Sequence, residues 1–245
     1  LREAAQAELA ENSEGAFVLD VAINFAGDQA FIMYRNSGPE WTGIFLSLPS
    51  GEVEATMPLL WPRYAKFSPD GTQIAVAGGE FATFFTLYDT TTGELIRHLG
   101  SANEGHSDHV SDRSIAFTPD GKRFVSADGG GNLFLWDVET GDLTERLLGH
   151  RGDRFFTLQM SPDGQTVVTG NQGKLHFWDI SQLGAAQVFE EHRDAVEILD
   201  VTISPDGTKA VSTAIVSPNE AILWDTSTFE IIHRLPGVYK TAAFL

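Results

Sequence analysis

A four-residue turn motif recurs along this chain and limits what the chain can fold into. Ser/Thr-Pro-Asp-Gly occurs four times in 245 residues, at successive steps of 50, 43 and 43 residues. The copies are Ser68–Gly71, Thr118–Gly121, Ser161–Gly164 and Ser204–Gly207. Pro presets φ for a turn and Gly supplies a positive φ, and short apolar runs flank each copy. Each motif therefore predicts a β-hairpin.

A second motif follows each hairpin. An apolar run ends in Trp-Asp three times and in Tyr-Asp once, and each time a turn and another apolar run come next. The four sites are Tyr88-Asp89, Trp136-Asp137, Trp178-Asp179 and Trp224-Asp225. Each repeat thus holds four predicted strands, and the chain is expected to be a tandem array of four-stranded antiparallel sheets.

These two motifs resemble the WD40-repeat family. Three Trp-Asp pairs, each a regular distance after a Pro-Asp-Gly turn, are highly specific for it, and the resemblance covers the chain from about residue 17 onward. It implies an all-β fold, a WD40-type β-propeller of four-stranded antiparallel blades around a central channel. It also implies five recognisable blades plus the start of a sixth, as part of a seven-bladed ring.

The repeat spacing divides the chain into expected blades at about 17–62, 63–109, 110–151, 152–195 and 196–238, with 239–245 as the first strand of a further blade. In the degenerate first repeat, Val21–Phe25 matches the inner strand and Ala26–Asp28 replaces the turn motif. Residues 1–15 are expected to form a linker or helical arm. Because the array stops inside a blade, we expect a fragment of a longer protein. The alternative is a ring that closes compactly, or as an oligomer, with the help of Leu1–Phe17.

Charge and composition narrow the classes of partner. The net charge is −18, which disfavours nucleic acid, because phosphates would be repelled, and favours a basic partner. No apolar run reaches the length of a membrane helix, so membrane insertion is not expected. The absence of Cys removes disulfides, thiolate zinc sites and thiol nucleophiles, and it leaves the compartment open.

The family resemblance assigns structural roles inside the blades. In the family, a His, a Ser or Thr, an Asp and the Trp form one buried hydrogen-bonded set per blade. The matching histidines are His106, His150 and His192, and Ser126 and Thr169 are candidates for the hydroxyls. The Asp is expected six residues before the Trp, where this chain has Gly130, Gln172 and Pro218. We therefore expect the buried Asp to be missing throughout, while the Trp-Asp pairs keep their structural role.

Outside the repeat motifs, few residues are candidates for metal binding, phosphate binding or catalysis. His106 and His109, with Asp108 and Asp112, could form a metal cluster, but an inter-blade polar loop is the favoured interpretation, since spacing alone shows no convergent geometry. Gly129–Gly131 lacks the Lys of a phosphate-binding loop and is expected to be a hairpin turn. Asp200, Asp206 and Asp225 are expected in turns or at strand ends. We predict no catalytic, cofactor-binding or metal-binding residues, and no cofactor.

Loops at one rim of a rigid scaffold are the usual place for function. The resemblance places six residues at such a rim as candidates for binding a partner: Arg113, Asp128, Arg154, Phe155, Asn171 and Glu197. The favoured function is a non-catalytic interaction scaffold for a protein or peptide, one module of a larger multidomain protein. The alternative is an enzymatic or cofactor-assisted propeller whose chemistry comes from a fused domain.

Overall fold

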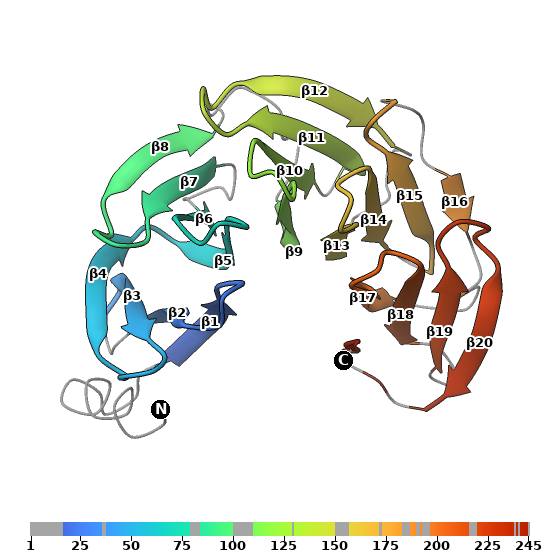
Figure 1. The fold of residues 1–245 in the computed structure, drawn as a ribbon, viewed down its shortest axis with the longest axis horizontal. Coiled ribbons are helices and arrows are strands. Elements are labelled where there is room, and N and C mark those ends of the chain that lie inside the picture. Colours follow the sequence, from blue (N-terminus) through green and yellow to red (C-terminus); the bar gives the residue numbers. More distant parts are fainter. Residues whose placement is uncertain are drawn as a thin grey trace. The chain divides into compact units, whose positions relative to one another are not determined.

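The structure consists of β-strands and their connections. It is a computed structural model that describes residues 17–35, 38–78, 84–99, 110–128, 130–149, 157–171, 173–182, 187–189, 192, 197–215, 220–237, 239 and 241–244. Twenty strands form five four-stranded antiparallel sheets, and in each sheet the spatial order follows the chain (Figure 1). The all-β class and the four strands per repeat are confirmed. The expected N-terminal arm, residues 1–15, lies outside the described residues. None of the described residues belongs to a helix that could cross a membrane.

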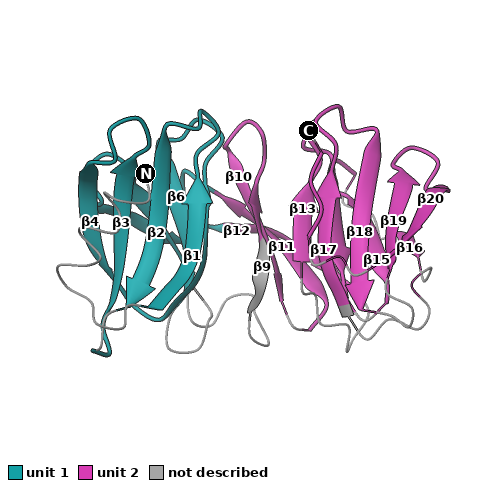
Figure 2. Ribbon diagram, turned by 90° about the horizontal axis from the view of Figure 1, so that it is seen from below, with its two compact units in different colours: residues 1–104, 138–142 teal, residues 105–137, 143–245 magenta. Residues whose placement is uncertain are grey.

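Two compact units divide these sheets (Figure 2). The first unit, residues 1–104 with 138–142, contains two sheets. Its strands are β1 (Phe17–Ile23), β2 (Gln29–Arg35), β3 (Trp41–Ser47), β4 (Val53–Leu59), β5 (Pro62–Phe67), β6 (Gln73–Gly78), β7 (Phe84–Asp89) and β8 (Leu95–Leu99). The second unit, residues 105–137 with 143–245, contains three sheets. Its strands are β9 (Val110–Phe117), β10 (Arg123–Asp128), β11 (Asn132–Asp137), β12 (Leu143–Leu148), β13 (Thr157–Met160), β14 (Thr166–Gly170), β15 (Leu175–Asp179), β16 (Gln187–Phe189), β17 (Glu197–Ile203), β18 (Lys209–Ile215), β19 (Glu220–Asp225) and β20 (Ile231–Pro236).

The turn motif closes the first hairpin of four sheets by the same hydrogen bonds. In the last copy, the Ser204 hydroxyl donates to Asp206 Oδ1 at 2.6 Å and accepts the Lys209 N–H at 2.9 Å. Gly207 has φ +72°, and its N–H donates to the Ser204 carbonyl at 2.8 Å. The motif therefore satisfies its own polar groups, which explains why the same four residues recur at each hairpin.

The first hairpin corrects the expected register of the degenerate repeat. Strand β1 ends at Ile23, and Asn24–Gly27 rather than Ala26–Asp28 occupies the turn position. The Gly27 N–H donates to the Asn24 carbonyl, and the Asn24 Oδ1 accepts the Gln29 N–H, as the serine hydroxyl does elsewhere. Phe25 is thus not the end of the inner strand; it stands in the turn, where the other copies have Pro, and is 93% exposed. The amide of Asn24 can replace the serine, which composition alone does not reveal.

Neighbouring sheets within each unit pack face to face through apolar side chains. In the first unit, Phe31, Phe45 and Met57 of the first sheet meet Ile74 and Val76 of the second. In the second unit, one cluster joins the third and fourth sheets and includes Trp178. Another joins the fourth and fifth sheets and includes Trp224. Both tryptophans are buried, and burying a side chain of this size stabilises a fold by about 2–3 kcal/mol.

An aspartate at a strand bulge links the inner strand of one repeat to the next. The Asp20 carboxylate, at the bulge of β1, accepts the backbone N–H of Ala65 in β5 at 3.2 Å. At the bulge of β17, the Asp200 carboxylate accepts the Ala242 N–H at 3.3 Å and the Thr241 hydroxyl at 2.6 Å. Asp200 therefore lies inside a strand, not in a turn. Residues 241–244 form no strand in this structure, so their assignment to a further blade stays a prediction.

The turn carboxylates predict a defined acid sensitivity. The Ser204 hydroxyl and the Thr208 N–H lower the pKa of Asp206 to about 2. Because this pKa lies below that of the unfolded chain, the carboxylate stabilises the fold above about pH 4, and this stabilisation is lost as the pH falls toward 2. We expect Asp206→Asn to lower the free energy of unfolding at pH 7, and its difference from wild type to shrink between pH 4 and 2. Urea unfolding at a series of pH values measures this, with the exposed Glu139→Gln as control; a constant difference would contradict it.

Candidate functional site

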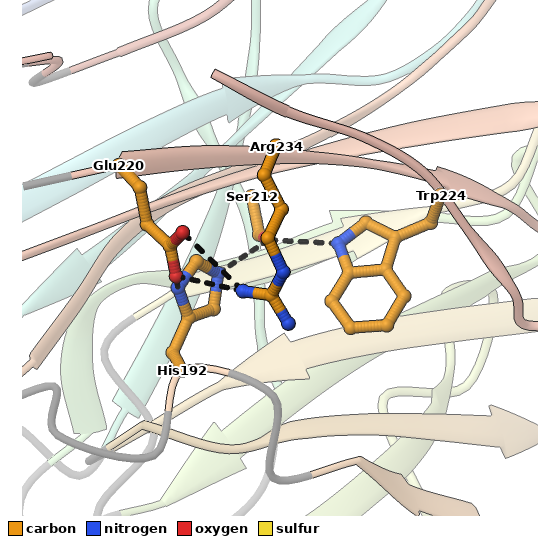
Figure 3. A network of polar contacts seen from close by, with 5 residues as sticks. All are labelled: His192, Ser212, Glu220, Trp224 and Arg234. Atoms are coloured by element: carbon orange, nitrogen blue, oxygen red, sulfur yellow. Dashed lines mark hydrogen bonds and ion pairs between the residues drawn. The ribbon is translucent and has the colours of Figure 1, made fainter. Parts of the chain in front are cut away.

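Five side chains form a network of polar contacts in the fifth sheet (Figure 3). The Trp224 indole N–H donates to the Ser212 hydroxyl oxygen at 2.8 Å, and His192 Nε2 lies 2.8 Å from the same oxygen. On the other side of the ring, His192 Nδ1 lies 3.3 Å from Glu220 Oε1. Arg234 Nη1 donates to both carboxylate oxygens of Glu220, at 3.0 and 3.3 Å.

The network joins four segments of the chain. Ser212 comes from β18, Glu220 and Trp224 from β19, and Arg234 from β20, while His192 precedes β17. A negative carboxylate beside Nδ1 favours a hydrogen on that nitrogen, which leaves Nε2 to accept the Ser212 hydroxyl. His192, Ser212 and Trp224 are buried, whereas Arg234 is exposed. Such an arrangement fixes the segment before β17 against the sheet.

The third and fourth sheets repeat the inner part of this network. The Trp136 indole N–H donates to the Ser126 hydroxyl at 2.8 Å, and that of Trp178 donates to the Thr169 hydroxyl at 3.0 Å. The sequence pattern had pointed to these two hydroxyls. In the fourth sheet, His176 stacks near Trp178 and its Nε2 lies 3.3 Å from the Asn171 amide nitrogen.

Carboxylates do occur in these sheets, at positions other than the one expected. In the fifth sheet, Glu220 stands four residues before Trp224 and contacts His192. In the third, Asp128 is fully buried, eight residues before Trp136, and accepts the N–H groups of Gly130 and Asn132 at 3.0 and 2.8 Å. The third sheet therefore does hold a buried Asp, contrary to expectation, but it bonds its own turn. In the fifth sheet the carboxylate beside the histidine is a half-buried Glu.

The six expected rim residues fall into three groups. Asp128 and Asn171 lie at the ends of β10 and β14, but both are fully buried. Arg113 and Glu197 belong to β9 and β17, and the structure describes the backbone there but not the side chains. Arg154 and Phe155 lie outside the described residues, as do His106, His109 and His150. Their role in binding a partner stays a prediction.

The aspartates of the Trp-Asp pairs stand at the turn between the third and fourth strands of their sheets. Asp179 accepts the N–H groups of Ser181 and Gln182, and Asp225 accepts those of Ser227 and Thr228. The hydroxyl of Ser227 and these N–H groups lower the pKa of Asp225 to about 2. Asp137 ends β11 and is half-buried. These carboxylates are therefore engaged in turns.

Metal ligands do not gather in the part of the chain that the structure covers: no three His, Asp or Glu side chains there could hold one ion. The carboxyl groups with lowered pKa values are spread over the turns of four sheets. They are Asp70, Asp89, Asp120, Asp179, Asp206 and Asp225. In each of them, hydrogen bonds from neighbouring turn residues lower the pKa. Sequence reasoning missed Glu220, Arg234 and His176, because no motif marks them and their contacts depend on strand register.

Two adjacent buried hydroxyls of β18 give a sharp test of the network. Ser212 bonds Trp224 and His192, whereas the buried Thr213 hydroxyl has no hydrogen-bond partner within the described residues. Ser212→Ala should lower the free energy of unfolding by about 2–4 kcal/mol, because two buried polar groups lose a partner. Thr213→Val should be neutral or stabilising. Denaturant unfolding of both variants measures this, and equal losses would contradict the network.

The outer ion pair should contribute less than the inner contact. Arg234 is exposed, and exposed ion pairs contribute about 0–1 kcal/mol. Arg234→Met should therefore lower the free energy of unfolding by less than about 1 kcal/mol. Glu220→Ala should cost more, about 1–3 kcal/mol, because His192 is buried and loses its carboxylate. Unfolding of the two single variants and the double variant measures both; an Arg234 effect larger than that of Glu220 would refute the assignment.

Comparisons with known proteins agree with this architecture. The family described as WD domain, G-beta repeat matches residues 93–137 and 141–179. The chain is 28% identical over 125 residues to the guanine nucleotide-binding protein subunit beta-5b of Danio rerio. This match covers 50% of this chain and 31% of that protein. It is 26% identical over 123 residues to the 66 kDa stress protein of Physarum polycephalum, and the match covers 49% of this chain and 19% of that protein. The chain thus spans less than a third of either relative.

Both matched segments fall where the structure has the expected elements. They contain the turn motifs at Thr118 and Ser161 and the tryptophans Trp136 and Trp178, each bonded to a strand hydroxyl. The remaining sheets repeat the same four-stranded order, and the fifth repeats the bond from tryptophan to hydroxyl. Residues 93–137 and 141–179 thus match the WD40 repeat, and all five sheets share the four-stranded antiparallel order of WD40 β-propeller blades.

Proposed function

We propose that this chain is a non-catalytic interaction scaffold that docks a protein or peptide, as one module of a larger multidomain protein. The proposal rests on one observation: polar side chains inside the sheets are hydrogen-bonded to one another. Ser126, Thr169, Ser212 and His192 are buried and bonded to the tryptophans or to each other. Groups that could act as nucleophile or base are thus engaged in holding strands together, which leaves binding to the loops.

The docking end is the one opposite the Ser/Thr-Pro-Asp-Gly turns. There β9 and β17 begin and β10 and β14 end, so Arg113, Asp128, Asn171 and Glu197 belong to the same end of their sheets. The opposite end is occupied by turns whose carboxylates are already hydrogen-bonded. Because Asp128 and Asn171 are buried, Arg113 and Glu197 are the better candidates for direct contact.

Charge and relatives support a protein partner. The net charge of −18 favours a partner with basic character and disfavours nucleic acid. The Danio rerio relative is named as a subunit of a guanine nucleotide-binding protein, that is, as one part of an assembly. A shared repeat with an assembly subunit is what a docking module would show, although fold alone does not fix function.

Charge reversal at the rim tests the proposal. The intact chain, tagged and cross-linked in cells, should recover at least one protein partner. The double variant Arg113→Glu with Glu197→Lys should recover much less of that partner, because reversed charges at the contact are repulsive. Mass spectrometry of the recovered proteins measures this.

The matched control is Gln165→Lys, an exposed turn residue at the opposite end of the fourth sheet. It should leave recovery unchanged. If no protein or peptide is recovered, or if the control and the rim variant lose the same partners, the proposed function is wrong.

A further inference from the structure

The first unit carries exposed aromatic side chains at the loop end of its strands. In register across the first sheet, Phe17 begins β1, Arg35 ends β2, Trp41 begins β3 and Leu59 ends β4. The chain then continues through Leu60 and Trp61 into β5. Phe17, Leu60 and Trp61 are 56%, 71% and 54% exposed. We call Phe17, Arg35, Trp41, Leu60 and Trp61 the aromatic rim.

The rim extends the apolar core into solvent. Leu59 and Trp41 pack on the cluster between the first and second sheets, and the Phe17 ring meets the Trp41 ring edge-on at 6.2 Å. Exposed aromatic groups continuous with a core are typical of interaction sites, since they add contact area while remaining rigidly placed.

Trp61 is held in an unfavourable backbone conformation. Its φ is +46°, in the left-handed region that L-residues avoid. Gly78, at the end of β6, lets the backbone of this connection pass close to the sheet: a Cβ there would lie 2.8 Å from the Trp61 carbonyl oxygen and 3.1 Å from that of Leu60. Strained backbone of this kind clusters at functional sites.

The charges on the rim select the kind of partner. Arg35 lies over the Trp41 ring, 5.0 Å from its centroid, so a positive charge already occupies that aromatic face. Arg35 is the cation that the structure shows in contact with an aromatic ring of this surface. A basic side chain would be repelled here, whereas a carboxylate could pair with Arg35.

We infer that the aromatic rim binds a peptide segment that presents a large apolar side chain next to an Asp or Glu. The apolar side chain would lie against Leu60 and Trp61, and the carboxylate would pair with Arg35. This inference rests on the proposed function and specifies one surface and one partner chemistry for it. It departs from the basic partner that the overall charge favours, because local charge governs the contact itself.

Selection from a random 12-residue peptide library displayed on phage, against the intact chain, tests the inference. The selected peptides should be enriched in Asp or Glu beside Leu, Phe or Trp. Synthetic versions should bind Trp61→Gly about tenfold or more weakly, as expected for a central aromatic contact. The melting temperature of Trp61→Gly should be unchanged or higher, because glycine relieves the strained φ. Arg35→Glu should switch the preference toward Lys and Arg.

Phe25→Ser is the matched control, since Phe25 is also an exposed aromatic of the first sheet but lies at its opposite end. It should bind the peptides like wild type. If the peptides bind Trp61→Gly as well as wild type, or if they are basic, the inference is wrong while docking elsewhere stands. If light scattering shows that the rim joins two copies of the chain, the inference is also wrong. If neither peptides nor a cross-linked partner are found, the proposed function fails as well.

Discussion

A hydrogen bond from a buried tryptophan to a strand hydroxyl is the interaction on which the second unit depends. Trp178 and Trp224 lie in the apolar clusters between its sheets. Leaving a buried indole N–H without an acceptor costs free energy, and Thr169 and Ser212 on the preceding strand provide the acceptor. The hydroxyl fixes the orientation of the ring, and the ring fixes the distance between sheets.

Beyond this shared pair of tryptophan and hydroxyl, the third and fifth sheets use different polar side chains to hold their connecting segments. The fifth uses His192, Glu220 and Arg234, whereas the third uses a buried Asp128 that closes its own turn. The hydroxyl keeps one register: in the third, fourth and fifth sheets it pairs across the strands with the residue two positions before the tryptophan. The carboxylates do not share a position, since Asp128 ends β10 and Glu220 begins β19. The hydroxyl position is therefore constant between these repeats, and the carboxylate position is not.

The same distinction explains what could be predicted from the sequence. The hairpins and the four strands per repeat follow from local motifs and their spacing, whereas the hydroxyls Ser126 and Thr169 follow from the resemblance to the WD40 family. The register of the first repeat was wrong, since Asn24 takes the role of a serine through its amide. The contact of Glu220 with His192 joins residues from different segments, so only the folded sheet reveals it. Of the expected rim residues, Asp128 and Asn171 are buried, which depends on how their turns close and which no sequence motif marks.

The two ends of the strands differ in how completely their polar and conformational demands are met. At the Ser/Thr-Pro-Asp-Gly turns, glycines take the positive φ values and serine, threonine and aspartate side chains bond the backbone. At the other end of the first unit, a tryptophan takes the positive φ, and an indole N–H lacks an acceptor among the described residues. A turn that served folding alone would favour glycine at position 61, since glycine takes a positive φ without strain. The tryptophan there is therefore better explained by what it contacts outside the chain than by what it contributes to the fold.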